Sequence, residues 1–168
     1  MGAGKTTLGR PLAKRLGVQF YDLDWYIANR MHKTIPELWR EQGEEKFRDI
    51  ERRMLHEVAE FEDVVISCGG GTPCFFDNMD YMNRQGETIY MQATPETLLR
   101  HLTLSPGNRP ILDGKDREEL LPFITDELAR REPFYLKARH LLPIPVLDNL
   151  RAIGETVESV ARKLGVGS

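Results

Sequence analysis

Apolar positions along the chain switch between helical and strand-like spacing. Leu8, Leu12 and Leu16 recur every four residues, which is the stripe of one helix face, and Gly17 is typical of a helix end. The apolar and aromatic run at 18–24 then predicts a short strand that ends in two carboxylates. Helix and strand therefore alternate from the start of the chain.

The alternation continues to the C-terminus. Helical composition extends over 25–60, with breaks predicted at 34–36 and at Gly43, and the continuous apolar run at 64–67 predicts a strand buried on both faces. Later patterns predict helices over 77–84, 95–104, 118–131 and 152–164, and strands over 87–92 and 142–147. This order favours an α/β domain with a mostly parallel sheet, whose ligands bind beyond the carboxyl ends of the strands.

Length and charge restrict the class of protein. The chain has 168 residues, which fits one domain over residues 1–168. Its 23 Lys and Arg against 26 Asp and Glu give a net charge of -3, which argues against a broad basic face for a nucleic acid or an anionic membrane. No run reaches the ~18 apolar residues of a membrane span, and no signal-peptide pattern is present. We expect a cytoplasmic monomer with no nucleic-acid or membrane partner, and Cys68 and Cys74 as free thiols.

The strongest chemical signal is a glycine-rich segment that opens the first predicted helix. A phosphate-binding loop needs glycines whose backbone N–H groups converge on oxygens, a lysine that reaches the outer phosphates, and a hydroxyl that holds Mg²⁺. The residues concerned are Gly2, Ala3, Gly4, Lys5, Thr6 and Thr7. The full pattern also has an earlier glycine and a preceding strand, and neither stands before Met1. The alternative is a glycine-rich helix start with an accidental lysine.

Two carboxylates follow at the end of the first predicted strand. Asp22 and Asp24 are two residues apart, so that their side chains would share one face of the strand. Alone, such a pair is typical of a solvated strand end. Beside a phosphate loop, we favour a division of work, in which one carboxylate holds a magnesium ion through water and the other contacts an acceptor hydroxyl.

Other candidate residues are charged side chains and glycines. Arg48 and Glu51 are three residues apart on a predicted helix and form either a surface ion pair or a fixed guanidinium that binds an anionic substrate. The run Gly69–Gly71 indicates that a ligand or another backbone approaches closely. Arg109 lies in a turn-rich segment, which we expect to be mobile and able to close over a nucleotide. The four histidines show no metal-ligand spacing and are interpreted as ordinary surface or boundary residues: His32, His56, His101 and His140.

Taken in this order, the segments resemble the shikimate kinase family of small P-loop kinases. The matching segments are 1–10, 22–24, 47–51, 69–71, 109–112, and Arg131 with 133–135. The resemblance implies a three-layer α/β/α fold whose mostly parallel sheet has about five strands, the first and central one being absent from this chain. It also implies an acceptor-binding segment at about 25–60 and a mobile lid at about 104–117.

The family implies transfer of the γ-phosphate of ATP to the 3-hydroxyl of shikimate with Mg²⁺, in the biosynthesis of chorismate and the aromatic amino acids. Residues 2–7 would bind the ATP phosphates, with Lys5 also catalytic. Thr6 would bind the metal, and Asp22 would assist it through water. Arg109 would reach the transferring phosphate from the lid, as a catalytic and ATP-binding group. Leu102 stands where many family members have an arginine that stacks on adenine.

On the acceptor side, the family implies that Asp24 contacts the reacting hydroxyl. The other residues implied to bind or orient the acceptor are Arg48 and Arg131 on its carboxylate, Glu51 on Arg48, and the backbone of Gly70 and Gly71. Two alternatives stay open. A different small-molecule P-loop kinase, such as a gluconate kinase, would not require two arginines, and a non-catalytic nucleotide-binding homologue is favoured by the missing first strand.

Overall fold

The computed structural model describes residues 4–104 and 117–165. The first helix, α1 (Lys5–Leu16), begins directly after Gly4, whose φ of 80° lies in the left-handed region that favours glycine. A Cβ on Gly9 would come within 2.4 Å of the Phe20 ring. Glycine at this position therefore lets α1 lie close to the strand that follows, β1 (Gln19–Asp22).

The remaining elements follow the predicted order. They are α2 (Leu23–Met31), α3 (Ile35–Val58), β2 (Val64–Ser67), the 3₁₀ turn η1 (Thr72–Cys74), α4 (Asn78–Gln85), β3 (Ile89–Gln92), α5 (Pro95–Leu104), α6 (Arg117–Tyr135), β4 (His140–Pro143) and α7 (Leu150–Lys163). None of the described helices combines the length and the apolar character that a membrane span requires.

The four strands form two parallel pairs. β1 runs beside β2, with Gln19 opposite Val64, and β3 runs beside β4, with Ile89 opposite His140. Within the described residues no ladder of hydrogen bonds joins one pair to the other. The predicted α/β architecture with parallel strands is confirmed, and its strands are arranged as two separate pairs.

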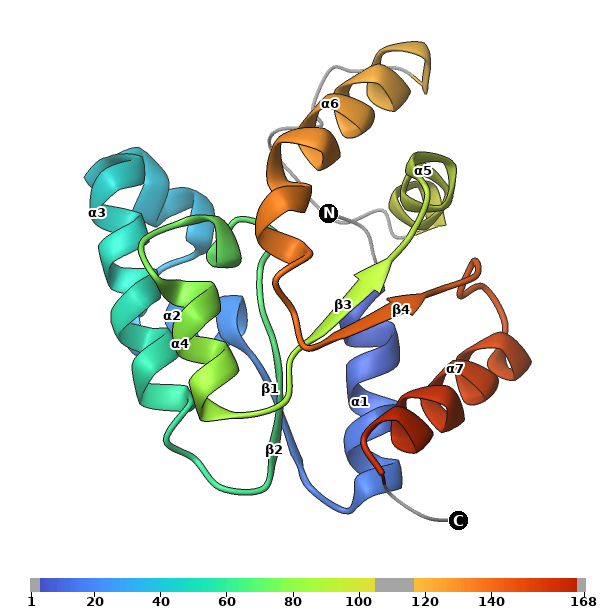
Figure 1. Cartoon of the computed structure of the whole chain (residues 1–168). Coiled ribbons are helices and arrows are strands. Elements are labelled where there is room, and N and C mark those ends of the chain that lie inside the picture. Colours follow the sequence, from blue (N-terminus) through green and yellow to red (C-terminus); the bar gives the residue numbers. More distant parts are fainter. Residues whose placement is uncertain (1–3, 105–116, 166–168) are drawn as a thin grey trace.

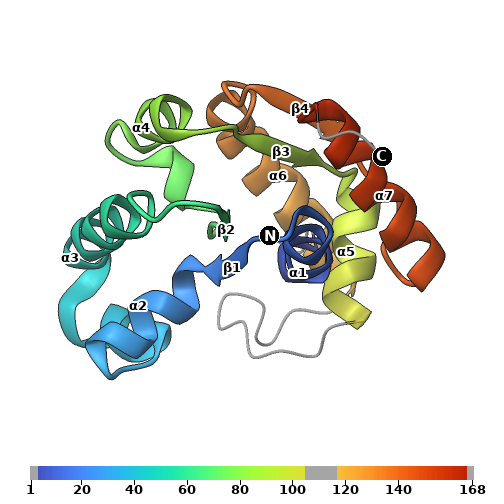
Figure 2. The ribbon, with the colours of Figure 1, turned by 90° about the horizontal axis from the view of Figure 1, so that it is seen from below.

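Two apolar clusters hold the helices around these pairs. One cluster gathers residues of α1, α5, α6 and α7 with the β3–β4 pair, and includes Leu12, Ile124 and Val160. The other gathers residues of α2, α3 and α4 beside the β1–β2 pair, and includes Ile27 and Phe47. Figures 1 and 2 show the same two groups of helices from two directions.

The strand predicted over 18–24 is too long, and the prediction that Asp22 and Asp24 share a strand face is wrong. Asp22 caps the next helix, because its carboxylate accepts a hydrogen bond from the Trp25 N–H at 3.1 Å. The chain therefore turns into α2 at Leu23, and Asp24 lies in the first turn of that helix.

Other boundaries differ by a few residues. β4 begins two residues earlier and ends four residues earlier than predicted, at Pro143, so it does not reach Pro145. α6 continues past its predicted end to Tyr135, with Pro133 inside it. The break predicted at Gly43 is confirmed by its φ of 82° and ψ of 167°, which kink α3.

Candidate active site

The phosphate-binding segment lies where α1 starts, beside the end of β1. Helical hydrogen bonding begins at once, because the Gly4 C=O accepts the Leu8 N–H at 2.8 Å. The Thr6 hydroxyl donates to the Asp22 carboxylate, with Oγ1 3.3 Å from Oδ2. A helix N-terminus with free N–H groups attracts anions, and here a hydroxyl and a carboxylate stand next to it. Gly2, Ala3 and Arg109, with residues 105–116 of the predicted lid at about 104–117, lie outside the described residues.

The pKa of the Cys68 thiol, just after β2, indicates which charged groups lie near the phosphate-binding segment. Burial raises the pKa of Cys68 to about 12. The positive charge of Lys5 opposes this rise, while the negative charges of Glu51, Asp24 and Asp22 add to it. The charges of Lys5 on α1, of the carboxylates at the β1–α2 turn and of Glu51 on α3 therefore act on one place in the fold.

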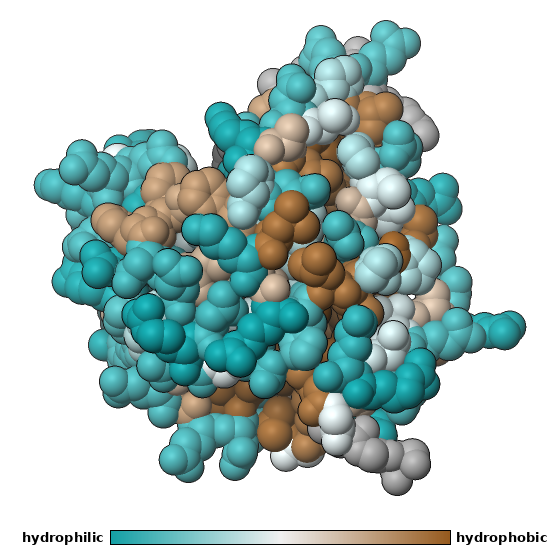
Figure 3. Space-filling model, viewed as in Figure 1, coloured by the Kyte–Doolittle hydropathy of each residue, from teal (hydrophilic) through white to brown (hydrophobic). Residues whose placement is uncertain are grey.

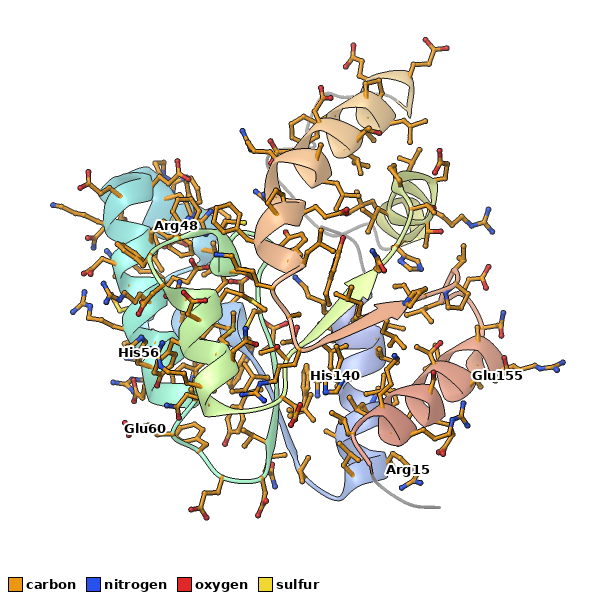
Figure 4. The ribbon with its side chains drawn as sticks, in the orientation of Figure 1. Arg15, Arg48, His56, Glu60, His140 and Glu155 are labelled. Carbon is orange, nitrogen blue, oxygen red and sulfur yellow. The ribbon has the colours of Figure 1, made fainter. Side chains whose placement is uncertain are left out.

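Arg48 belongs to a buried network. Its side chain is 9% exposed and that of Glu51 is 1% exposed, so the interpretation as a surface ion pair is wrong. The Arg48 Nη1 donates to Glu51 Oε1 at 3.0 Å, and the guanidinium carbon lies 4.2 Å from the centre of the Phe75 ring. Figure 4 shows Arg48 on α3, beside the loop that leads into α4. The guanidinium is thus held from two sides before any ligand binds.

Gly71 makes room for the Arg48 guanidinium. A Cβ on Gly71 would lie 2.5 Å from Arg48 Nη2 and 2.9 Å from its Cζ. The φ of Gly71 is -87°, which any residue adopts, so glycine is needed here for space alone. At Gly69 a Cβ would meet the Asp24 carboxylate only at 3.4 Å, an ordinary contact. The close approach predicted from the glycine run thus occurs at Gly71, and the approaching group is a side chain of the protein.

Thr72 and Asn78 complete the network behind Glu51. The Thr72 hydroxyl donates to Glu51 Oε2 at 2.9 Å, and the Asn78 side-chain amide donates to the Thr72 C=O at 3.0 Å. Both residues are fully buried. Burial raises the pKa of Glu51, while the charge and hydrogen bond of Arg48 and the hydrogen bond of Thr72 lower it. Neither Thr72 nor Asn78 stands in a pattern that predicts this role from the sequence.

Arg131 approaches the same region from α6. Its Nη2 lies 3.2 Å from Glu127 Oε2, one helical turn earlier. Burial raises the pKa of the Cys74 thiol, and the positive charges of Arg131 and Arg48 lower it, so the thiol lies near both arginines. The surface is indented between the parts formed by α3 and α6 (Figure 3). The charges of the two arginines predicted to act together therefore both act on the Cys74 thiol.

His101 has a structural role that its sequence position does not indicate. It is buried, and its Nε2 accepts the backbone N–H of Leu147 at 2.8 Å, so the prediction of a surface or boundary histidine is wrong for this residue. A Cβ on Gly4 would lie 3.8 Å from the His101 ring. The histidine thus connects the start of α1 with the loop after β4. Leu102, the next residue, is part of the apolar cluster around β3 and β4.

This α/β fold joins a helix start suited to phosphate with carboxylates beside it and two arginines nearby, which defines a P-loop kinase of the small-molecule class. Comparison with known families makes the assignment specific. The model of the family described as shikimate kinase matches residues 1–161, and this chain belongs to that family.

Individual relatives agree with the family. A shikimate kinase of Phocaeicola vulgatus is 52% identical over 164 residues, which cover 98% of this chain and 94% of the relative. The crystal structure of shikimate kinase from Bacteroides thetaiotaomicron has a TM-score of 0.93 at 49% identity, over 98% of this chain and 94% of that chain. Shikimate kinase from Acinetobacter baumannii in complex with shikimate has a TM-score of 0.84 at 30% identity, over 98% of this chain and 89% of that chain. The resemblance predicted from the motifs is confirmed.

Proposed function

We propose that this protein transfers the γ-phosphate of ATP to the 3-hydroxyl of shikimate, giving shikimate 3-phosphate and ADP. Membership of the family supports this reaction. The observation in the fold that carries it is the buried Arg48, which is fixed by Glu51 and Phe75 and whose charge acts on the same thiol, Cys74, as the charge of Arg131. A guanidinium matches a carboxylate through two parallel hydrogen bonds, and shikimate is a small monoanion that carries one carboxylate.

On the nucleotide side, residues 2–7 bind the ATP phosphates and Lys5 reaches the outer ones. The Thr6 hydroxyl and the Asp22 carboxylate fit Mg²⁺, which prefers oxygen ligands and keeps several waters. A magnesium ion held by these two residues would supply positive charge next to the phosphates. Arg109 adds a further positive charge at the transferring phosphate. A cytoplasmic location and a monomeric state remain predictions from the sequence.

On the acceptor side, Asp24 orients the reacting hydroxyl. Phosphoryl transfer depends mainly on positioning and charge neutralisation, so Asp24 contributes more by holding the hydroxyl than by removing its proton. Arg48 and Arg131 bind the carboxylate, Glu51 orients Arg48, and the backbone of Gly70 and Gly71 binds a ring hydroxyl. These roles are assigned by the motif positions, and the buried network around Arg48 supports them.

An assay of ADP release tests the proposed reaction. We expect ADP formation from ATP and Mg²⁺ with shikimate, and only background ADP with gluconate or with no acceptor. The physical reason is the fixed pair of arginines, which suits a rigid ring carboxylate. Equal ADP release with and without shikimate would contradict the proposal and favour the non-catalytic alternative, and release with gluconate alone would favour the other kinase.

Thr72→Val should weaken shikimate binding through Glu51. The change removes the hydroxyl that lowers the Glu51 pKa, so the pKa, already raised by burial, rises further and Glu51 is protonated at a higher pH. The other charged groups that act on Glu51 are Arg48 and Asp24. Neutral Glu51 orients Arg48 less firmly, and we expect the KM for shikimate to rise about tenfold, equivalent to ~1.4 kcal/mol.

The pH profile of that KM is the second measurement. As pH falls, the KM should begin to rise at a higher pH in Thr72→Val than in the unmodified protein. Thr72→Ser keeps the hydroxyl and serves as the control, with a KM close to that of the unmodified protein. A Thr72→Val enzyme with unchanged KM and an unchanged profile would show that Thr72 does not act on Glu51.

A further inference from the structure

Tyr135, the last residue of α6, reaches across to the glycine run. Its hydroxyl donates a hydrogen bond to the Gly70 C=O, from a residue 65 positions away in the chain. The side chain thereby joins α6, which carries Arg131, to the loop that follows β2. Tyr135 belongs to a motif that suggests the family, but none of the roles assigned so far includes it.

The Tyr135 hydroxyl also lies beside Arg131. Burial raises the pKa of Tyr135 to about 12, and the charge and hydrogen bonding of Arg131 oppose this rise. At neutral pH the phenol therefore keeps its proton and remains a donor. The hydroxyl that donates to a backbone carbonyl of the glycine run is thus also influenced by an arginine predicted to bind the acceptor.

The ring of Tyr135 is fixed by Tyr90 of β3. The two ring centres are 5.1 Å apart with an angle of 48° between their planes. The Tyr90 hydroxyl donates to Glu132 Oε2 at 2.9 Å, which ties the same end of α6 to the strand. With the ring and the helix end both held, the Tyr135 hydroxyl has a defined position relative to Gly70.

The bond to the Gly70 C=O acts on the Gly71 N–H, because both belong to one planar peptide unit. A donor at the carbonyl fixes the plane of that peptide and polarises its N–H, which makes the N–H a better donor. In the described part of the chain, no backbone hydrogen bond uses the Gly71 N–H. We propose that Tyr135 is a positioning residue, which holds the Gly70–Gly71 peptide so that its N–H donates to a hydroxyl of the acceptor. This inference rests on the proposed function.

Steady-state kinetics of Tyr135→Phe test the proposal. The variant keeps the ring and its contact with Tyr90 and loses only the hydroxyl. We expect the KM for shikimate to rise five- to tenfold, with kcat and the KM for ATP changed less than twofold. If Tyr135 only stabilised the fold, the variant would have a lower melting temperature, and its KM for shikimate would not rise relative to its KM for ATP.

Tyr81→Phe is the matched control. The Tyr81 hydroxyl also donates to a backbone carbonyl, that of His56 at 3.4 Å, but it bonds a turn of α3 rather than the glycine run. Its loss should leave both KM values unchanged. A Tyr135→Phe enzyme with the unmodified KM for shikimate, or with equal changes in both variants, would overturn the proposal. If the unmodified protein released no ADP in response to shikimate, the proposed function itself would fail, which is a separate outcome.

Discussion

Lys5→Ala is expected to lower kcat for shikimate phosphorylation by about 10³-fold, the effect of losing a fixed positive charge at developing negative charge. Lys5 is the first residue of α1 and is half-buried, and its charge acts on the same place as the charges of Asp22 and Asp24. A lysine there can follow the phosphoryl group during transfer without rearranging the helix. Alanine is a good helix former, so the fold should tolerate the change.

Lys14→Ala is the control for Lys5. Lys14 is exposed in the last turn of the same helix, far from the end that faces phosphate. Lys14→Ala should leave kcat unchanged, and the melting temperatures of Lys5→Ala and Lys14→Ala should both lie within a few degrees of that of the unmodified protein. A Lys5→Ala enzyme that kept more than a tenth of the normal kcat would exclude Lys5 from phosphate binding during transfer.

Gly71→Ala is expected to raise the KM for shikimate by 10- to 100-fold, and to leave the KM for ATP close to normal. The new methyl group would occupy the position of the Arg48 guanidinium, at 2.5 Å from Nη2. Because Arg48 is the flexible partner, it must move and lose its bond to Glu51, its stacking on Phe75, or both. Such overpacking costs about 1–3 kcal/mol, which corresponds to the expected change in KM.

The matched control is Gly86→Ala. Gly86 has extended backbone with φ of -177°, and a Cβ there would meet no atom within 4 Å. Kinetics with shikimate and ATP varied in turn, together with the melting temperature, separate a local effect from a general one. Equal KM values for Gly71→Ala and Gly86→Ala would show that the position of Arg48 does not govern acceptor binding.

Much of the fold follows from local patterns. The four-residue stripe defines α1, Thr34 caps α3 by accepting the Glu37 N–H at 3.2 Å, and Gly43 breaks that helix. The local pattern fails at Asp22, where strand composition and helix capping compete for the same residue. Asp22 becomes the cap of α2 because the first N–H groups of this helix need an acceptor, and the helix begins one residue later, at Leu23.

The site was predictable where its residues are neighbours in sequence. Arg48 and Glu51 stand three positions apart, so helical geometry alone predicts that they meet. Thr72 reaches Glu51 from 21 positions away, and Tyr135 reaches Gly70 from 65 positions away. A local sequence pattern does not predict contacts between residues so far apart in the chain, because these contacts depend on how α3, α4 and α6 pack around the loop.

The packing of Gly71 against Arg48 also limits how this part of the protein can change in evolution. Glu51, Gly71 and Thr72 each contact Arg48 or the group that holds it, and residues in contact have non-additive mutational effects. A larger residue at position 71 would be tolerated only after Arg48 had been replaced. Replacement of Arg48 would in turn leave the buried carboxylate of Glu51 without its charged partner. We therefore expect the residues at positions 48, 51, 71 and 72 to be conserved together or substituted together in evolution.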